Sequence, residues 1–326
     1  MNTKKLLITF ILLTVCSVHA QTDEKETLKQ INQQLVSNYQ KQKFDEAIKL
    51  GQQAVDLSLK IYGENNVETA VAYTNLGVIY RDKNKFKESI ENLQKAVNTY
   101  ESVSNLKSKE QVTAYEALAV SQILGGFNKE AEFNYLKAIE TAESKFGKES
   151  KESFSPVLNL ANLYARDRNF EKANDYYLKS YDLAIKHYGK AGKEIEQIED
   201  SRICLFTVQG FNFSKSETFK AFYEKKKQLF GDTPEYGEAL SAKAKVLPKP
   251  ELPSEVRSQG LGGSIPVRVK IDEQGKVLEA KTVCGNPILG KASEEAVKKA
   301  RFETVLVNGK PIKYSGIVIY SYIPPR

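Results

Sequence analysis

The sequence predicts an all-α solenoid of helix-turn-helix repeats, followed by a small α+β domain with an antiparallel sheet. Three observations lead to this prediction. Small residues recur every 42 residues over most of the chain, prolines interrupt that pattern near residue 250, and short runs of alternating apolar residues follow. Self-similarity at a period of 20–50 residues is typical of stacked repeats.

The 42-residue period is visible in two sets of small residues and in aromatic-glycine pairs. The first set is Ala47, Ser89, Ala131 and Ala173; the second, seven residues later, is Ala54, Ala96, Ala138 and Ser180. The aromatic-glycine pairs are Tyr62-Gly63, Phe146-Gly147, Tyr188-Gly189 and Phe230-Gly231, and only Ser104-Asn105 breaks their series. Small side chains at these positions let two helices approach closely, while larger neighbours fill the space between layers.

The pattern predicts about five helix pairs in residues 21–231. The expected pairs are 23–41 with 44–61, 66–83 with 86–103, 108–124 with 128–146, 150–167 with 170–188, and 193–209 with 214–230. In the last pair Lys215 and Phe222 replace the two small residues. This degeneracy suits a terminal repeat, whose outer face has no neighbour.

The N-terminal residues 1–20 are typical of a signal peptide. Lys4 and Lys5 precede an apolar run of 13 residues, Leu6 to Val18, and small residues follow at a cleavable position. We expect cleavage before Gln21 and export to the periplasm. An uncleaved inner-membrane anchor is the alternative, although the run is shorter than the roughly 20 residues that span a bilayer. A lipid attached at Cys16 is disfavoured because Val15 precedes it.

Residues 232–252 are expected to form a linker, and residues 253–326 a separate domain. Ile265 to Ile271 alternates apolar with polar residues as a strand with one buried face does. Pro266 favours an edge position or an irregular start for this strand. The remaining expected elements are a turn at 272–275, a strand at 277–283, a helix at 288–300, a strand at 304–307, a turn at Asn308-Gly309 and a final strand at 314–322.

Charge and composition argue against catalysis and nucleic-acid binding. The net charge of +7 is concentrated at the C-terminus, where residues 249–326 hold 13 Lys/Arg against 8 Asp/Glu. This charge could favour an acidic partner or surface, although the sequence favours a solvated basic face. No Arg-rich arm suggests nucleic acid. The glycine-rich stretch at 260–263 precedes a strand, so it lacks the context of a phosphate-binding loop. We therefore expect no enzyme, no catalytic residue, no metal, no cofactor and no small-molecule substrate.

Two cysteines, Cys204 and Cys284, remain after the expected cleavage, together with a single histidine, His187. An exported chain can form disulfides, but these cysteines fall in different predicted domains. The sequence therefore favours a buried thiol at Cys204 and a loop thiol at Cys284 over a bridge.

The repeat region resembles the tetratricopeptide repeat in the 42-residue form of kinesin light chain. Leu76-Gly77, Tyr80, Phe86 and Ala96 fall on that family's positions, as do Leu160-Ala161, Tyr164, Phe170 and Ala173. Gln34 and Gln122 depart from the pattern, at a leucine and a tyrosine position. The resemblance implies a scaffold for protein contacts. On its groove, Asn75, Asn159 and Asn162 are candidates for holding the backbone of an extended peptide through paired donor and acceptor groups.

The C-terminal residues resemble the C-terminal domain of the energy transducer TonB. The landmarks, in order, are Pro250 and Pro253, Gly260 and Gly263, the turn 271–277, the stretch 285–289, Ala292, Ala296, Phe302 and the stretch 308–312. Val256 and Cys284 depart from the family's usual residues. The resemblance implies a periplasmic domain to which a transporter's peptide adds as a strand.

The last strand is the candidate edge for that addition: Ile317, Val318, Ile319, Tyr320, Ser321 and Tyr322. The competing interpretation is that Ile317 and Ile319 belong to the core and the tyrosines cap it. A neutral helical array occupies the place of a transducer's Pro-rich spacer. The resemblance to TonB also implies a Ser and a His at helical spacing in a membrane anchor, where they couple to the inner-membrane motor. Here Ser17 and His19 are two residues apart, which is the wrong spacing for one helix face. The sequence thus favours an exported adaptor for proteins or extended peptides, with outer-membrane transporters as possible partners. The alternative is a membrane-anchored TonB-type transducer.

Overall fold

A computed structural model describes residues 23–103, 109–209, 217–230, 243–307 and 309–323. The expected signal peptide at 1–20 lies outside these residues, as do Ser104, Lys215 and Asn308. The chain divides into two compact units, Met1–Pro156 and Val157–Arg326.

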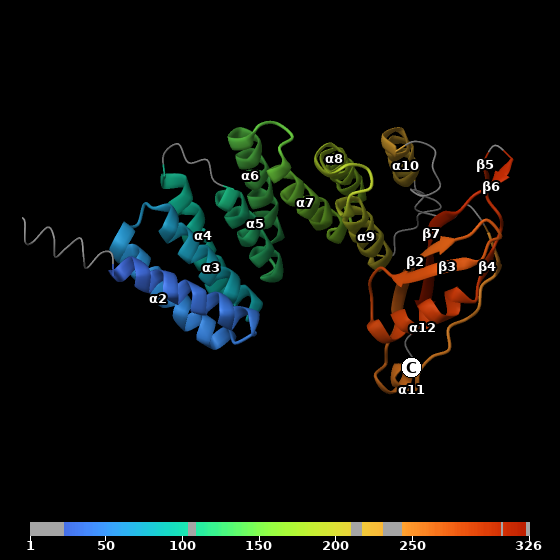
Figure 1. Cartoon of the computed structure of the whole chain (residues 1–326), viewed down its shortest axis with the longest axis horizontal. Coiled ribbons are helices and arrows are strands. Elements are labelled where there is room, and N and C mark those ends of the chain that lie inside the picture. Colours follow the sequence, from blue (N-terminus) through green and yellow to red (C-terminus); the bar gives the residue numbers. More distant parts are fainter. Residues whose placement is uncertain (1–22, 104–108, 210–216, 231–242, 308, 324–326) are drawn as a thin grey trace, which may run out of the picture. The chain divides into compact units, whose positions relative to one another are not determined.

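The first unit is a series of antiparallel helices (Figure 1, blue to green). Residues 23–40 are helical. They are followed by α2 (Phe44–Tyr62), α3 (Val67–Asp82), α4 (Phe86–Ser102), α5 (Lys109–Leu124), α6 (Asn128–Phe146) and the 3₁₀ turn η1 (Lys151–Ser153). Each helix from α2 to α6 packs against the next. The helix bounds agree with the prediction from the 42-residue period.

The periodic small residues form the contacts between these helices. Ala47, Ala54, Ser89 and Ala96 are at most 1% exposed, and their counterparts in α6 are fully buried. The one hydroxyl among them keeps its hydrogen bonds, because Ser89 Oγ donates to the Gly77 carbonyl over 2.7 Å and lies 2.8 Å from Ser121 Oγ. Close helix packing therefore leaves this polar group satisfied.

The second unit begins with four helices. They are α7 (Phe154–Arg166), which starts just before the unit, α8 (Phe170–Tyr188), α9 (Lys193–Val208) and α10 (Glu217–Phe230). Both α9 and α10 pack against α8. Phe222, which replaces a small residue in the last repeat, is 2% exposed and lies against the Tyr181 ring at 6.3 Å. The degenerate repeat thus keeps a packed interior by using larger side chains.

A three-stranded antiparallel sheet follows in the same unit. Its strands are β2 (Gly263–Ile271), β3 (Val277–Thr282) and β7 (Tyr314–Tyr322), in the order β3-β2-β7. Helix α12 (Pro287–Lys298) packs on β2 and β3, and the short helix α11 (Ser254–Ser258) precedes the sheet. Val267, Val269, Ile271, Leu289 and Val297 are buried in the shared core. The predicted α+β arrangement of one helix on an antiparallel sheet is confirmed.

Two short strand pairs flank this sheet. β1 (Ala244–Val246) pairs with β4 (Arg301–Phe302), and β5 (Leu306–Val307) pairs with β6 (Lys310–Pro311). The range 232–252, expected as a linker, therefore contains a strand that pairs with the C-terminal domain.

The turn between β2 and β3 requires a glycine. Gly275 has φ +82°, and a Cβ there would lie 2.1 Å from the Phe302 carbonyl oxygen. Asp272 Oδ1 accepts hydrogen bonds from the main-chain N–H groups of Gln274 and Lys276. The predicted turn is confirmed, and it also contacts β4 through its backbone.

The edge position that Pro266 suggested for β2 was wrong, because β2 is the central strand. Its ladder with β3 begins one residue later, at the pair Val267–Thr282. Pro266 contributes only its carbonyl, which accepts from the Val283 N–H over 2.9 Å. Proline has no main-chain N–H, and at Pro266 this costs no hydrogen bond of the ladder between β2 and β3, which ends at Val267.

Candidate functional site

Strand β7 forms one edge of the sheet. All nine of its residues pair with β2, from Tyr314 opposite Ile271 to Tyr322 opposite Gly263, without a register shift. Its other side pairs with no strand in the part of the chain that the structure describes. The edge strand proposed from the sequence thus occupies the position that strand addition requires.

Alternation along β2 shows which main-chain groups of β7 point outward. The Pro266 carbonyl faces β3, so the groups of Val267 face β7, since successive residues of a strand point to opposite sides. Pro266 lies opposite Ile319. This pair consequently exchanges no hydrogen bonds, and the N–H and carbonyl of Ile319 point away from the sheet. The same alternation turns the main-chain groups of Ile317 and Ser321 outward.

The interpretation that placed Ile317 and Ile319 in the core was wrong. Val318 is 7% exposed, whereas Ile319 is 42% exposed and Ile317 is half-buried. The reason is the register, which sets Val318 opposite the buried Val267. Because side chains alternate, a change of one residue reverses the two faces.

Tyr320 and Tyr322 fix the end of β7 to the rest of the domain. The Tyr320 hydroxyl donates to the Pro248 carbonyl over 3.2 Å, and the Tyr322 hydroxyl lies 2.5 Å from Ser293 Oγ on α12. Burial raises the pKa of Tyr320 to about 12. These side chains position the edge strand while Ile319 remains accessible beside it.

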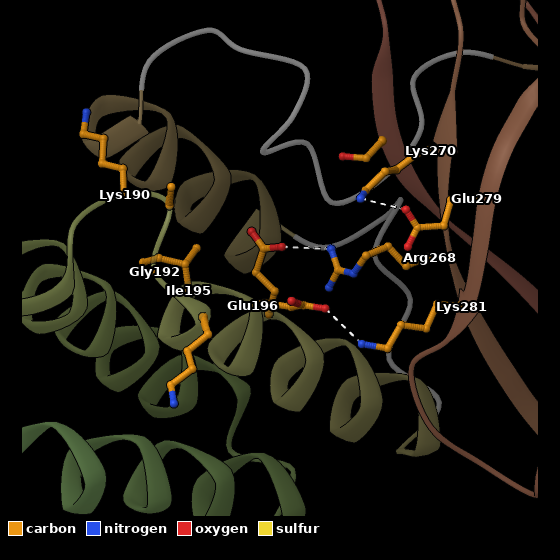
Figure 2. Close-up of a pocket in the computed structure, with 12 residues that line it drawn as sticks. Lys190, Gly192, Ile195, Glu196, Arg268, Lys270, Glu279 and Lys281 are labelled. Carbon is orange, nitrogen blue, oxygen red and sulfur yellow. Dashed lines mark hydrogen bonds and ion pairs between the residues drawn. The ribbon is translucent and has the colours of Figure 1, made fainter.

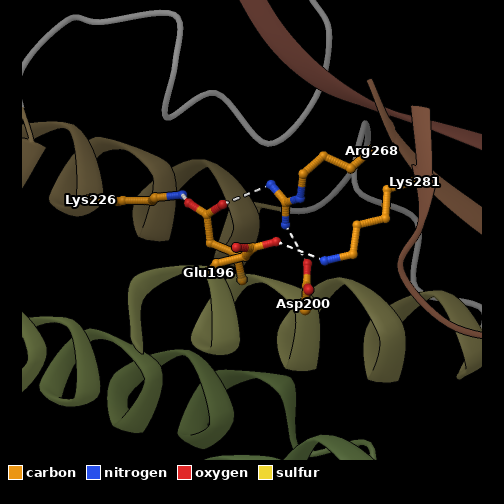
Figure 3. A network of polar contacts seen from close by, with 6 residues as sticks. Glu196, Asp200, Lys226, Arg268 and Lys281 are labelled. Carbon is orange, nitrogen blue, oxygen red and sulfur yellow. Dashed lines mark hydrogen bonds and ion pairs between the residues drawn. The ribbon is translucent and has the colours of Figure 1, made fainter. Parts of the chain in front are cut away.

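The outer face of the sheet, opposite α12, packs against α9 through ion pairs (Figure 3). Arg268 Nη1 lies 3.0 Å from Glu199 Oε2, and its Nη2 lies 2.5 Å from Asp200 Oδ1. Glu199 Oε1 also accepts from Lys226 Nζ of α10 over 2.7 Å. One carboxylate therefore joins α9, α10 and β2.

The charged side chains of this network are largely buried. The side chains of Lys226, Glu199 and Arg268 are 2%, 10% and 18% exposed. Burial by itself lowers the pKa of Arg268, but the carboxylates of Glu199 and Asp200 outweigh it and raise that pKa overall. The guanidinium stays charged, so the contact between helix and sheet depends on its anionic partners.

A cavity of about 420 Å³ opens beside this network (Figure 2). Its walls come from the start of α9 and from the outer face of β2 and β3. Two further ion pairs cross or border it, Lys281–Glu196 at 3.2 Å and Lys270–Glu279 at 2.7 Å. Most of its charged groups thus already neutralise one another.

A disulfide also joins α9 to the sheet. Cys204 on α9 and Cys284, just after β3, are bonded, with their Cα atoms 5.8 Å apart. The expectation of two separate thiols was wrong. It treated the last repeat and the C-terminal domain as independent, whereas α9 packs directly on the sheet.

The three asparagines predicted for the repeat groove lie on two helices, α3 and α7. Asn75 is half-buried on α3 in the first unit, and Asn159 and Asn162 are half-buried on α7 in the second. Asn162 Oδ1 accepts a hydrogen bond from the Tyr177 hydroxyl over 2.8 Å. Peptide binding by these residues remains a prediction.

Sequence reasoning missed Glu199, Asp200 and Arg268. A usable signal was present, because acidic residues at 196, 199 and 200 share a helix face while Arg268 and Lys281 occupy outward positions on adjacent strands. Only the packing of α9 on the sheet brings these charges together.

Two family models match the chain, in the regions that the fold separates. The tetratricopeptide repeat model matches residues 34–102, and the model of the Gram-negative bacterial TonB protein C-terminal matches residues 248–324. The chain is a tetratricopeptide repeat protein with a C-terminal TonB domain. Both families are non-catalytic and bind proteins.

Solved structures agree with the repeat fold. BtubC (BKLC) from P. vanneervenii superposes with a TM-score of 0.53 at 15% identity, covering 73% of this chain and 93% of its own. A proposed kinesin light chain from Podosopora anserina, with nearly identical TPR-like repeats, gives 0.50 at 14% identity and covers 62% and 94%. At such identities the likeness concerns the fold alone. None of the curated proteins matches the chain.

Among the described residues, which exclude the first 22, the helices are all too short or too polar to cross a membrane.

Proposed function

We propose that this protein is an exported, non-enzymatic adaptor of the periplasm. Its repeats hold one protein partner, and its TonB domain binds an extended segment of another by strand addition to β7. Outer-membrane transporters are the class of partner that the TonB domain suggests.

The observation that carries this proposal is the outward direction of the main-chain groups of Ile317 and Ile319 on an edge strand. An added strand gains affinity from hydrogen bonds to such groups and selectivity from alternate side chains. Half-exposed Ile319 offers an apolar contact for one of those side chains. An edge of this kind attracts strands and is normally protected in a monomer.

The Cys204–Cys284 disulfide supports a location outside the cytoplasm, because disulfides persist in oxidising compartments. Sequencing the N-terminus of the mature protein tests this part of the proposal. We expect the chain to begin at Gln21. A chain that begins at Met1 and sediments with membranes would instead favour the membrane-anchored transducer.

Substitution of Ile319 by proline tests strand addition directly. Ile319→Pro removes an outward N–H without removing a hydrogen bond of the β2 ladder, so the domain should remain folded. Full-length wild type, Ile319→Pro and the control Ile319→Val are immobilised and exposed to detergent-solubilised outer-membrane proteins. We expect wild type and Ile319→Val to retain the same proteins, and Ile319→Pro to lose them.

Circular dichroism should show the same fold for all three proteins. A folded Ile319→Pro variant that retains the same partners to the same extent would refute the role of β7. Loss of binding in Ile319→Val as well would assign the affinity to the Ile319 side chain, which contradicts main-chain hydrogen bonds as its source.

A further inference from the structure

Two cavities in the first unit occupy the same position in successive repeats. One, of about 390 Å³, lies among α2, α3 and α4, and the other, of about 570 Å³, lies among α4, α5 and α6. Their lining residues correspond at the 42-residue period, including Val55 with Val97, Tyr73 with Tyr115, and Asn92 with Asn134. They are two versions of one inter-repeat cavity. A lining residue that differs between them therefore marks where their binding properties can differ.

In the first cavity, polar side chains contact one another. The Tyr80 hydroxyl accepts a hydrogen bond from Gln52 Nε2 over 3.0 Å. The ammonium of Lys95 lies 5.6 Å from the centre of the Tyr73 ring. The Tyr80 hydroxyl and the Lys95 ammonium thus already have partners inside the first cavity.

The second cavity has Gln122 at the position of Tyr80, the departure from the family pattern noted in the sequence. Gln122 is 7% exposed, and its Oε1 accepts from Asn134 Nδ2 over 2.8 Å. Gln94, the counterpart of Gln52, donates instead to Asn98 over 2.8 Å. Within the described residues, Gln122 Nε2 makes no hydrogen bond, although it lines a cavity of this size.

Asn134 complements that unused donor. Its Nδ2 donates both to Gln122 and to the Glu130 carbonyl, at 2.8 and 3.1 Å. The side-chain oxygen of Asn134 therefore stays available as an acceptor in the same cavity. A donor and an acceptor held by nine-tenths buried side chains match the two polar groups of one peptide unit.

The rim of the second cavity favours a positively charged neighbour. Glu101 replaces the apolar Leu59 of the first cavity and accepts a hydrogen bond from the Tyr115 hydroxyl, and Glu130 adds a second carboxylate. Of the cations beside them, Lys129 lines the cavity and Lys137 pairs with Glu140 over 2.8 Å. Phe133 is 59% exposed, and its ring already has the Lys137 ammonium 5.9 Å from its centre. An aromatic face beside carboxylates suits a lysine or arginine side chain, whose stem packs on the ring.

We propose that the cavity at Gln122 and Asn134 binds an extended peptide segment, with one peptide unit on the two amides and a basic side chain at Glu101 and Glu130. The site differs from the groove predicted at Asn75, because the cavity-lining residues of α3, Tyr73, Leu76 and Tyr80, share a helix face that Asn75 does not. The inference rests on the proposed role of the repeats as a protein-binding scaffold.

The test is a titration of the full-length protein with two acetylated and amidated pentapeptides, Ala-Leu-Lys-Leu-Ala and Ala-Leu-Glu-Leu-Ala. The side-chain amide signals of Gln122, Asn134 and Asn75 are followed by NMR. We expect the lysine peptide to shift the Gln122 and Asn134 signals, with a Kd in the range of about 1 mM for so short a ligand. The glutamate peptide should bind at least about tenfold more weakly.

Gln122→Tyr restores the residue that the chain itself uses at Tyr80, so this variant should fold. We expect it to weaken binding of the lysine peptide at least about tenfold. Tyr80→Phe, which changes only the first cavity, is the matched control and should bind as wild type does. Glu101→Gln should reduce the preference for the lysine peptide.

Three results would overturn the inference. They are equal binding of both peptides, undiminished binding by folded Gln122→Tyr, and no shift of Gln122 up to about 10 mM peptide, a concentration beyond the weakest affinity expected. A shift at Asn75 without one at Gln122 would refute this site while still supporting peptide binding by the repeats.

Discussion

Glu199 is the residue that joins the last repeat to the TonB domain most directly. Its carboxylate contacts both Lys226 and Arg268, and these side chains are largely shielded from water. Removing one charge from a buried pair leaves its partner unpaired, which costs far more than the net value of the intact pair. The energetic weight of this residue therefore exceeds that of any ion pair at the surface.

We expect Glu199→Gln to lower the free energy of unfolding by about 3 kcal/mol, because buried Lys226 loses its carboxylate and Arg268 keeps only Asp200. Glu196→Gln is the matched control on the same helix. Its partner Lys281 is 62% exposed, so the loss should stay below about 1 kcal/mol. Chemical denaturation of full-length protein, followed by circular dichroism, gives both values. Similar losses for the two variants would contradict the assigned network.

Tyr320 gives the domain a dependence on alkaline pH. Burial raises its pKa from the ordinary value of 10.0 to about 12. A group with a higher pKa in the folded than in the unfolded chain stabilises fully below the unfolded value, about pH 10, and loses that contribution as the pH rises towards 12. Tyr320→Phe should therefore decline less steeply than wild type between these pH values.

Denaturation of both proteins across that pH range measures the two slopes. Tyr320→Phe should be the less stable protein at neutral pH, because it lacks the hydrogen bond to Pro248. Curves that remain parallel up to pH 12 would show that the hydroxyl is not shielded.

At the scale of elements, the contact between α9 and the sheet turns two predicted domains into one packed unit. The disulfide closes a sequence separation of 80 residues and the ion network lies on the same helix. The first attaches α9 beyond the end of β3, and the second attaches it to the middle of β2. Together they fix the outer face of the sheet and leave the β7 edge open.

We expect the Cys204→Ser, Cys284→Ser double variant to lose about 4 kcal/mol of stability, the value typical for a loop of this length. Reduction of wild type with a thiol reagent should produce the same loss, because the same link is broken. Reduced wild type that unfolds at the same denaturant concentration as the oxidised protein would contradict a bond that supports the fold.

For the whole molecule, the sequence was sufficient to place the helices because one period repeats in many independent positions. Ala47, Ala96 and Ala131 mark where helices must approach closely, and the helix bounds follow from them. The residue ranges of β2, β3 and β7 and the turn at Gly275 were equally readable, since turn chemistry and alternation are local.

What the sequence did not reveal depends on tertiary packing. Every residue from Ile317 to Tyr320 is apolar or aromatic, so alternation along the strand cannot show which of them face the core. Only the register with β2 determines this. The disulfide and the Glu199 network join residues far apart in the chain. Cysteine connectivity in particular cannot be deduced from spacing alone.

The central claim is that β7 presents an open edge to a partner strand, and amide hydrogen exchange in the full-length protein tests it most directly. We expect the N–H groups of Ile317, Ile319 and Ser321 to exchange rapidly, since they point away from β2. Those of Gly316, Val318 and Tyr320 should exchange slowly, because they bond within the sheet. Slow exchange at all six residues in the isolated protein would show that the edge is already covered and would contradict the account.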